Sequence, residues 1–108
     1  MVNIKKKYDI FGVGAAIVDT EILVTDDFLA KHEIGKGLMT LVDEERQAYL
    51  INALNNHTAH KKKACGGSAC NSIVAASSFG SETFYAGKVA SDKDGGVFCK
   101  DLNAAGVA

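Results

Sequence analysis

The spacing of apolar residues changes along the chain, and each change predicts a switch between strand and helix. The run YDIFGVGAAIVDTEILV is rich in β-branched and aromatic residues and is apolar on both faces, so Tyr8–Val13 is predicted as a buried strand of the parallel type. Thr83–Ala90 is predicted as a further strand, and DEERQAYLINALNNH between them has the period of an amphipathic helix. Strands that alternate with helices predict βαβ units around a parallel sheet, which is an α/β fold.

Capping residues predict three further helices, at about 26–35, 69–79 and 92–105. Asp26 is expected as the N-cap of the first helix, which Gly35 ends, and Ser68 as the N-cap of the second. Asp92 is expected as the N-cap of the third helix, and Gly106 as its left-handed C-terminal cap. A strand is expected to follow, and because the chain ends there we expect it to be a fragment.

Three further short segments are predicted as strands. They are TEILVT, KGLMTLV and KKKACGG, of which the last runs into a glycine turn. The first two lack crossover helices of their own, so we expect them to form a small separate sheet that leans over the main one.

The composition limits the classes of function. The 108 residues are 47% hydrophobic and 23% charged, which fits one globular domain with its own core. The net charge of −1 provides no global field for nucleic acid or an anionic membrane, so neither is expected as a partner. No apolar run approaches the ~18 residues of a membrane span, and three cysteines without a signal peptide favour reduced thiols and a cytoplasmic location.

One stretch, ACGGSACNSIVAASSFG, allows two interpretations. As a metal site it would combine His57, His60, Cys65 and Cys70 in the pattern H-x2-H-x4-C-x4-C. This spacing is looser than that of structural zinc sites, and buried free cysteine is common in proteins without metal. A small zinc-binding protein is therefore the weaker alternative. We expect that none of these residues binds a metal ion.

As a ligand cradle, the same stretch uses its glycines and the helix that follows them. Gly66 and Gly67 permit close approach of the backbone, and the free N–H groups at the start of the helix favour an anion. Asn71 carries both a donor and an acceptor, which suits pairs of sugar hydroxyls. Asp19 is the only acid inside the run GVGAAIVDT, where a carboxylate must be paired, capping or binding.

Two phosphate-binding motifs fail at specific positions. The segment Gly12-Val13-Gly14 follows a strand, but Ile17 stands where a dinucleotide fingerprint needs its third glycine. The pair Gly87-Lys88 lacks the first glycine of a P-loop, since Glu82 occupies that position. Neither stretch is predicted to bind phosphate.

Four motifs together resemble a known family. GVGAAIVD, DEER, CGGSACNSI and YAGKVASDKDG, in this order, resemble the N-terminal third of a PfkB-type (ribokinase-like) carbohydrate kinase, with adenosine kinases and their bacterial relatives most similar. The resemblance covers nearly the whole chain. It implies a doubly wound, Rossmann-like parallel sheet with a small β lid. Residues 1–108 would be the N-terminal portion of a single kinase domain, with lid strands at about 20–25, 36–42 and 60–66.

The resemblance also implies a reaction, the transfer of the γ-phosphoryl group of ATP to a hydroxymethyl group of a ribonucleoside or sugar. Asp19 would bind sugar hydroxyls, Gly66, Gly67 and Asn71 would hold the ribose, and Ser68 would add a polar contact. The lid around Leu38–Leu41, with Met39, would cover the substrate and exclude water. A homodimer through the lid would fit the same arrangement.

Family members are much longer than this chain, and their catalytic Asp, ATP site and magnesium site lie near the C-terminus. No catalytic residue is therefore expected within these residues, and ATP and Mg would be bound elsewhere. Adenosine kinases usually carry Asn where this chain has Ala15, whereas the apolar lid residues favour a purine, so adenosine is expected ahead of a free sugar. A non-catalytic ligand-binding domain of the same fold is the other alternative.

Overall fold

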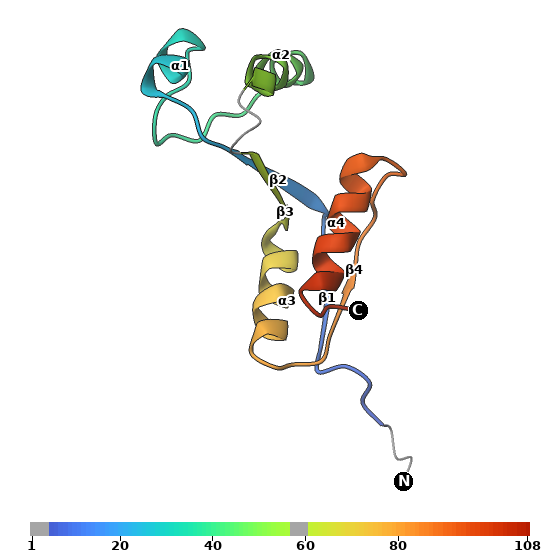
Figure 1. Cartoon of the computed structure of the whole chain (residues 1–108). Helices are drawn as coiled ribbons and strands as arrows, with labels where there is room; N and C mark the ends of the chain where they lie inside the picture. The colour runs from blue at the N-terminus through green and yellow to red at the C-terminus, as the bar shows by residue number, and fades with distance from the viewer. Residues whose placement is uncertain (1–4, 57–60) are drawn as a thin grey trace. The chain divides into compact units, whose positions relative to one another are not determined.

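The computed structural model describes residues 5–56 and 61–108, and these form two compact units (Figure 1). The first unit comprises Met1–Asp19 and Lys63–Ala108, and the second comprises Thr20–Lys62. The chain thus leaves the first unit after Asp19 and returns to it at Lys63. Strands and helices are interspersed along the described residues and two of the strands pair in parallel, which fits the predicted α/β class.

A parallel pair of strands forms the sheet of the first unit. Strand β1 (Ile10–Val13) pairs with β4 (Thr83–Ala86), with Ile10 opposite Thr83 and Val13 opposite Ala86. The parallel pairing confirms the prediction. Strand β4 ends at Ala86 and not at the predicted Ala90. The reason is that β1 ends at Val13 and has no further residues with which β4 could pair.

A second two-stranded sheet pairs β2 (Ile17–Ile22) with β3 (Lys61–Gly66). The strand expected at KKKACGG is therefore present, and it runs directly into the glycine turn. The strand expected at TEILVT is displaced toward the N-terminus, since β2 begins at Ile17 and ends before Leu23.

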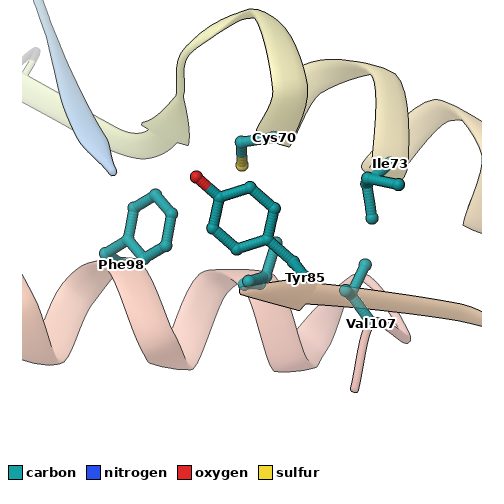
Figure 2. Packing of buried hydrophobic residues seen from close by; sticks show 6 residues of the cluster. Cys70, Ile73, Tyr85, Phe98 and Val107 are labelled. Carbon is teal, nitrogen blue, oxygen red and sulfur yellow. The ribbon is translucent and has the colours of Figure 1, made fainter. Parts of the chain in front are cut away.

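Helices α3 (Ser68–Ser78) and α4 (Lys93–Ala104) build the core of the first unit with the β1–β4 sheet. A Cβ on Gly12 of β1 would lie 2.9 Å from Ile73 Cδ1, so the missing side chain lets α3 approach the strand closely. The rings of Tyr85 and Phe98 lie 5.8 Å apart between the strand and α4 (Figure 2). The core consists of Cys70, Ile73, Tyr85, Phe98, Leu102 and Val107.

The other face of this sheet is not buried. Phe11 is 60% exposed and Val13 is 70% exposed, while Phe11 stacks on Phe84 with ring centroids 4.8 Å apart. The prediction that Tyr8–Val13 is buried on both faces is therefore wrong for this face. The reason is geometric, because Gly12 and its partner Tyr85 contact α3 and α4, and the intervening residues point the other way.

Helix α4 begins and ends as predicted. The Asp92 carboxylate accepts a hydrogen bond of 2.7 Å from the Gly95 N–H, and Gly106 has a φ of 84°. The Gly106 and Val107 N–H groups donate to the carbonyls of Asn103 and Leu102, which is the Schellman pattern. Ala108 then exchanges hydrogen bonds of 3.1 Å with Thr83 and Tyr85, so it pairs with the edge of β4 opposite β1.

The second unit contains helices α1 (Asp26–Lys31) and α2 (Glu44–Leu54). The N-cap of α1 is Thr25, whose hydroxyl accepts from the Phe28 N–H at 3.2 Å, and not the predicted Asp26. The Thr25 hydroxyl satisfies the Phe28 N–H, which a cap at Asp26 would leave without a hydrogen-bond partner. The helix ends before Gly35 because Glu33 adopts a φ of 57°, outside the helical region.

The predicted amphipathic helix is present as α2, with Asp43 as its N-cap. Polar and aromatic contacts join it to the end of α1. His32 Nδ1 lies 3.0 Å from the Tyr49 hydroxyl, Arg46 donates to the His32 carbonyl, and the His32 ring lies 4.3 Å from that of Phe28. None of the residues described in α2 is fully buried.

The strand expected at 36–42 is absent, so this prediction is wrong. Residues 36 and 37 form a turn and residues 38–43 have no regular structure. Leu38, Met39 and Leu41 are 74%, 87% and 85% exposed. A strand needs a hydrogen-bonded neighbour, and none of the described strands pairs with this segment.

Across residues 5–56 and 61–108, every helix is too short or too polar to cross a bilayer.

Candidate functional site

The Asp19 carboxylate lies directly against the backbone of Gly66. A Cβ built on Gly66 would collide with this carboxylate, coming within 2.7 Å of its Cγ atom. Asp19 belongs to β2 and is exposed, whereas Gly66 is the last residue of β3 and is buried. Only glycine leaves room for the carboxylate in this position, so the two residues form one structural element.

Gly67 turns the chain from β3 into α3. Its φ of 97° lies in the left-handed region, and a Cβ on this residue would lie 3.0 Å from the Ala15 carbonyl oxygen. A side chain is thus excluded both by the backbone conformation and by the available space. Gly67 is also the N-cap of α3, because its carbonyl accepts the Asn71 N–H at 2.8 Å.

Ser68 is therefore not the N-cap that the sequence predicted. It already has helical geometry as the first residue of α3, and the helix has no side-chain cap. The N–H groups of the first turn accordingly have no partner within the helix. They form a local concentration of donors and of positive potential beside the glycine turn.

Two polar side chains extend from the start of α3. Ser68 and Asn71 are both exposed and lie three residues apart, which places them on the same side of the helix. Five of the six predicted site residues belong to the first unit, on the paired strands β2 and β3 and at the start of α3: Asp19, Gly66, Gly67, Ser68 and Asn71. Their roles stay predictions. Met39, the sixth, belongs to the irregular segment of the second unit.

The cysteines beside the glycines, Cys65 and Cys70, are free thiols. Burial first, and then the neighbouring Cys70 thiol and Asp101 carboxylate, raise the pKa of Cys65 to about 12. A metal ligand must be a thiolate, so this environment opposes metal binding. His57 and His60 lie outside the described residues, and no group of three or more potential metal ligands occurs within them.

Two polar groups near the glycine turn, one half-buried and one buried, were not found from the sequence. Asp101 of α4 accepts a hydrogen bond of 2.7 Å from the Cys65 N–H. The Tyr85 hydroxyl is buried and finds no hydrogen-bond partner among the described residues, and burial raises its pKa. Asp101 and Cys65 are 36 residues apart, so no local pattern in the sequence indicates their contact.

Two solved structures are similar to this chain over almost its whole length. A probable sugar kinase from Rhizobium etli CFN 42 shares 35% identity over 95% of this chain, with a TM-score of 0.74. The adenosine kinase from Sinorhizobium meliloti shares 37% identity over 94% of it, with a TM-score of 0.73. The chain spans 30% of the length of each. No model of a known protein family matches the sequence, and neither does any curated protein.

Proposed function

Because this chain is part of a ribokinase-like kinase, we propose that it carries the substrate-binding portion of an enzyme that phosphorylates a ribonucleoside or a sugar. The reaction would transfer the γ-phosphoryl group of ATP to a hydroxymethyl group of the substrate. The observation that carries the proposal is the Asp19 carboxylate held against Gly66 beside the start of α3.

In this proposal, each polar group of the site binds a hydroxyl of the substrate. The Asp19 carboxylate accepts hydrogen bonds from sugar hydroxyls, and its charge strengthens them. Gly66 and Gly67 let the substrate approach the backbone, and the N–H groups at the start of α3 donate to its oxygens. Asn71 and Ser68 add side-chain contacts. Together these groups orient the hydroxymethyl group for transfer.

The proposal includes a larger sheet and a lid. The parallel β1–β4 pair, with α3 and α4 on one face, fits one part of a doubly wound sheet. Residues 20–25 and 60–66 would belong to lid strands, and they overlap β2 and β3. The exposed apolar residues at 36–42, including Met39, would close over the substrate and exclude water.

ATP and magnesium belong to the chemistry of such kinases, and the described residues do not fit the metal ion. They include no set of three or more His, Cys, Asp or Glu side chains that could hold a metal ion. We therefore expect ATP and Mg to be bound by residues outside this chain, together with the catalytic base. The purified 108-residue chain should not turn over ATP above a buffer blank, because its residues supply only substrate contacts.

For the substrate, we propose adenosine ahead of ribose or fructose. The two similar structures are a sugar kinase and an adenosine kinase at nearly equal identity, so they favour neither. The exposed side chains of Leu38, Met39 and Leu41 suit the flat face of a purine better than a fully hydroxylated sugar. Ala15 weighs against a nucleoside, but one missing hydrogen bond costs only about 0.5–1.5 kcal/mol.

The test is a competition assay with a kinase-length protein that contains this chain. Adenosine, ribose and fructose are supplied at equal concentration with ATP and magnesium, and each product is quantified. A higher kcat/KM for adenosine supports the proposal, and a higher value for a free sugar contradicts the choice of substrate. Binding of a substrate without any phosphorylation would favour a non-catalytic ligand-binding domain.

The same apolar segment supports a proposal about assembly. Leu38, Met39 and Leu41 expose more apolar surface than isolated surface residues usually do, and a second copy of the chain could cover it. The proposed assembly is a homodimer through the lid. Sedimentation of the kinase-length protein and its Leu41→Asp variant tests this, because a charge in the interface should shift the dimer toward monomer. Identical sedimentation of the two proteins as monomers would contradict it.

A further inference from the structure

The glycine turn of the candidate site is attached to helix α4 by one side chain. The Asp101 carboxylate accepts a hydrogen bond of 2.7 Å from the N–H of Cys65, which directly precedes Gly66. Asp101 is half-buried, and the contact is shielded from solvent in part. Hydrogen bonds to charged groups are stronger than those between neutral groups, so this contact fixes the end of β3 more firmly than a neutral one would.

The thiol of Cys65 is held from another direction. It packs against the buried core that contains Cys70 of α3, and Cys70 is completely buried beside Tyr85 (Figure 2). The residue before the glycines is therefore fixed by α4 through its backbone and by α3 through its side chain. Both helices are parts of the same core through Phe98, Leu102 and Ile73.

The backbone conformation of Gly66 and Gly67 is not determined by these two residues themselves. Glycine populates many backbone conformations, so its position depends on the residues around it. The Asp19 carboxylate fits against Gly66 only while the backbone stays where it is, since even a Cβ would collide there. A small displacement of Cys65 would change this contact and the direction of the first N–H groups of α3 together.

We propose that Asp101 is a positioning residue for the substrate site. It holds the Cys65 backbone so that Gly66 stays under the Asp19 carboxylate and α3 begins in register with it. Asp101 contacts no substrate itself, and it acts through the strand end. This inference rests on the proposed function, because Asp101 can position the site for a substrate only if the site binds one.

The kinetic test compares Asp101→Ala and Asp101→Asn with Asn103→Ala in a kinase-length protein that contains this chain. Asn103 is exposed on the same helix, so its replacement controls for general effects on α4. Asp101→Ala should raise the KM for the phosphoryl acceptor about tenfold and leave the KM for ATP within about twofold. Asp101→Asn keeps an acceptor oxygen and should recover most of the loss, and Asn103→Ala should match the wild type.

Hydrogen exchange provides a readout that does not depend on catalysis. Backbone amides in residues 64–71 should exchange at least about fivefold faster in Asp101→Ala than in Asn103→Ala. The amides of α4 should exchange at the same rate in both variants. Unchanged exchange in this segment would overturn the proposal whatever the kinetics. Faster exchange in this segment with an unchanged KM for the acceptor would also overturn the proposal. So would an equal rise in the KM values for the acceptor and for ATP, because the contact would then be merely structural.

The wild-type protein separates this proposal from the function on which it rests. If the wild type phosphorylates no nucleoside or sugar, the proposed function fails, and the positioning role fails with it. If the wild type is active and Asp101→Ala retains the acceptor KM of the wild type, only the role of Asp101 is wrong.

Discussion

The two units of the molecule use their apolar residues in opposite ways. The first unit buries six hydrophobic residues in one core, from Cys70 to Val107. Among the described residues of the second unit, the only buried side chain is that of His32, while Met39 and Leu41 are more than four-fifths exposed. The first unit therefore has a core that can hold a site in place, and the second presents apolar surface that nothing within it covers.

This difference in burial fits the separate roles in substrate binding that we propose for the two units. Precise polar contacts need a rigid support, and Asp19, Gly66 and Asn71 all belong to the unit with the core. An element that closes over a substrate must leave its apolar side chains uncovered before closure, and residues 38–42 have this property.

The largest expected effect concerns the core of the first unit. Phe98→Ala in a kinase-length protein that contains this chain should lower the free energy of unfolding by about 3–5 kcal/mol, because it removes a ring that is 97% buried against Tyr85. Leu41→Ala in the second unit should change it by less than about 0.5 kcal/mol, since this side chain is exposed. Urea denaturation measures both. Equal losses would show that the two units do not differ as described.

The next effect concerns the carboxylate of the site. Asp19→Asn should weaken acceptor binding ten- to hundredfold, which corresponds to about 1.5–3 kcal/mol for a charge-assisted hydrogen bond, and leave ATP binding nearly unchanged. Asn71→Ala should act in the same direction but more weakly. Titration calorimetry with each ligand gives both affinities. A loss of ATP affinity with acceptor affinity intact would mean that the site is placed wrongly.

Gly66→Ala provides a matched test of the same contact. The added methyl group would displace the Asp19 carboxylate, so the single variant should lose acceptor affinity about as strongly as Asp19→Asn. Because both changes remove one interaction, the double variant should be little worse than either single variant. Fully additive losses in calorimetry would show that Gly66 and Asp19 act independently.

A smaller effect is expected from the second unit. Met39→Ala should raise the KM for a nucleoside about three- to tenfold, which corresponds to roughly 1 kcal/mol of lost apolar contact, without changing stability. Ile51→Ala, on α2 of the same unit and 51% exposed, is the control and should leave the KM unchanged. A KM for Met39→Ala equal to that of the control would remove this residue from the site.

An effect that is seen only at high pH concerns the thiol beside the glycines. The pKa of Cys65 is raised from 9.0 to about 12, so the folded protein keeps this proton at pH values where the unfolded chain loses it. The contribution of this thiol to the free energy of unfolding should therefore be constant below about pH 9 and decrease between pH 9 and 12, and Cys65→Ala should reduce this slope. Denaturation at a series of pH values tests this. A slope that is unaffected by Cys65→Ala would contradict the prediction.

Metal content gives a separate check on the same residues. The double change of Cys65 and Cys70 to Ala should cost roughly 1–3 kcal/mol of packing and leave the metal content unchanged. Stoichiometric zinc in the native protein that disappears in the double variant would favour the metal interpretation instead.

Local features of this fold could be predicted because their causes lie within a few residues. Asp92 caps α4 through the N–H of Gly95, and Gly106 ends it by adopting a positive φ that other residues avoid. The spacing of apolar residues likewise predicted α2 and the parallel β1–β4 pair. The glycine pair and Asp19 were recognised as candidates for the same reason, because backbone freedom and an isolated acid are visible in the sequence.

Only the tertiary structure decided the rest. Residues 36–42 have the side chains of a strand, but none of the strands described in the structure pairs with them. The N-cap of α3 is Gly67 because the turn requires its positive φ. The contact between Asp101 and Cys65 joins residues 36 positions apart. The sequence by itself determined both ends of α4, where Asp92 and Gly106 act through hydrogen bonds that close within five residues. Strand partners, and the groups that hold the glycine turn, depend on which surfaces distant segments present to each other.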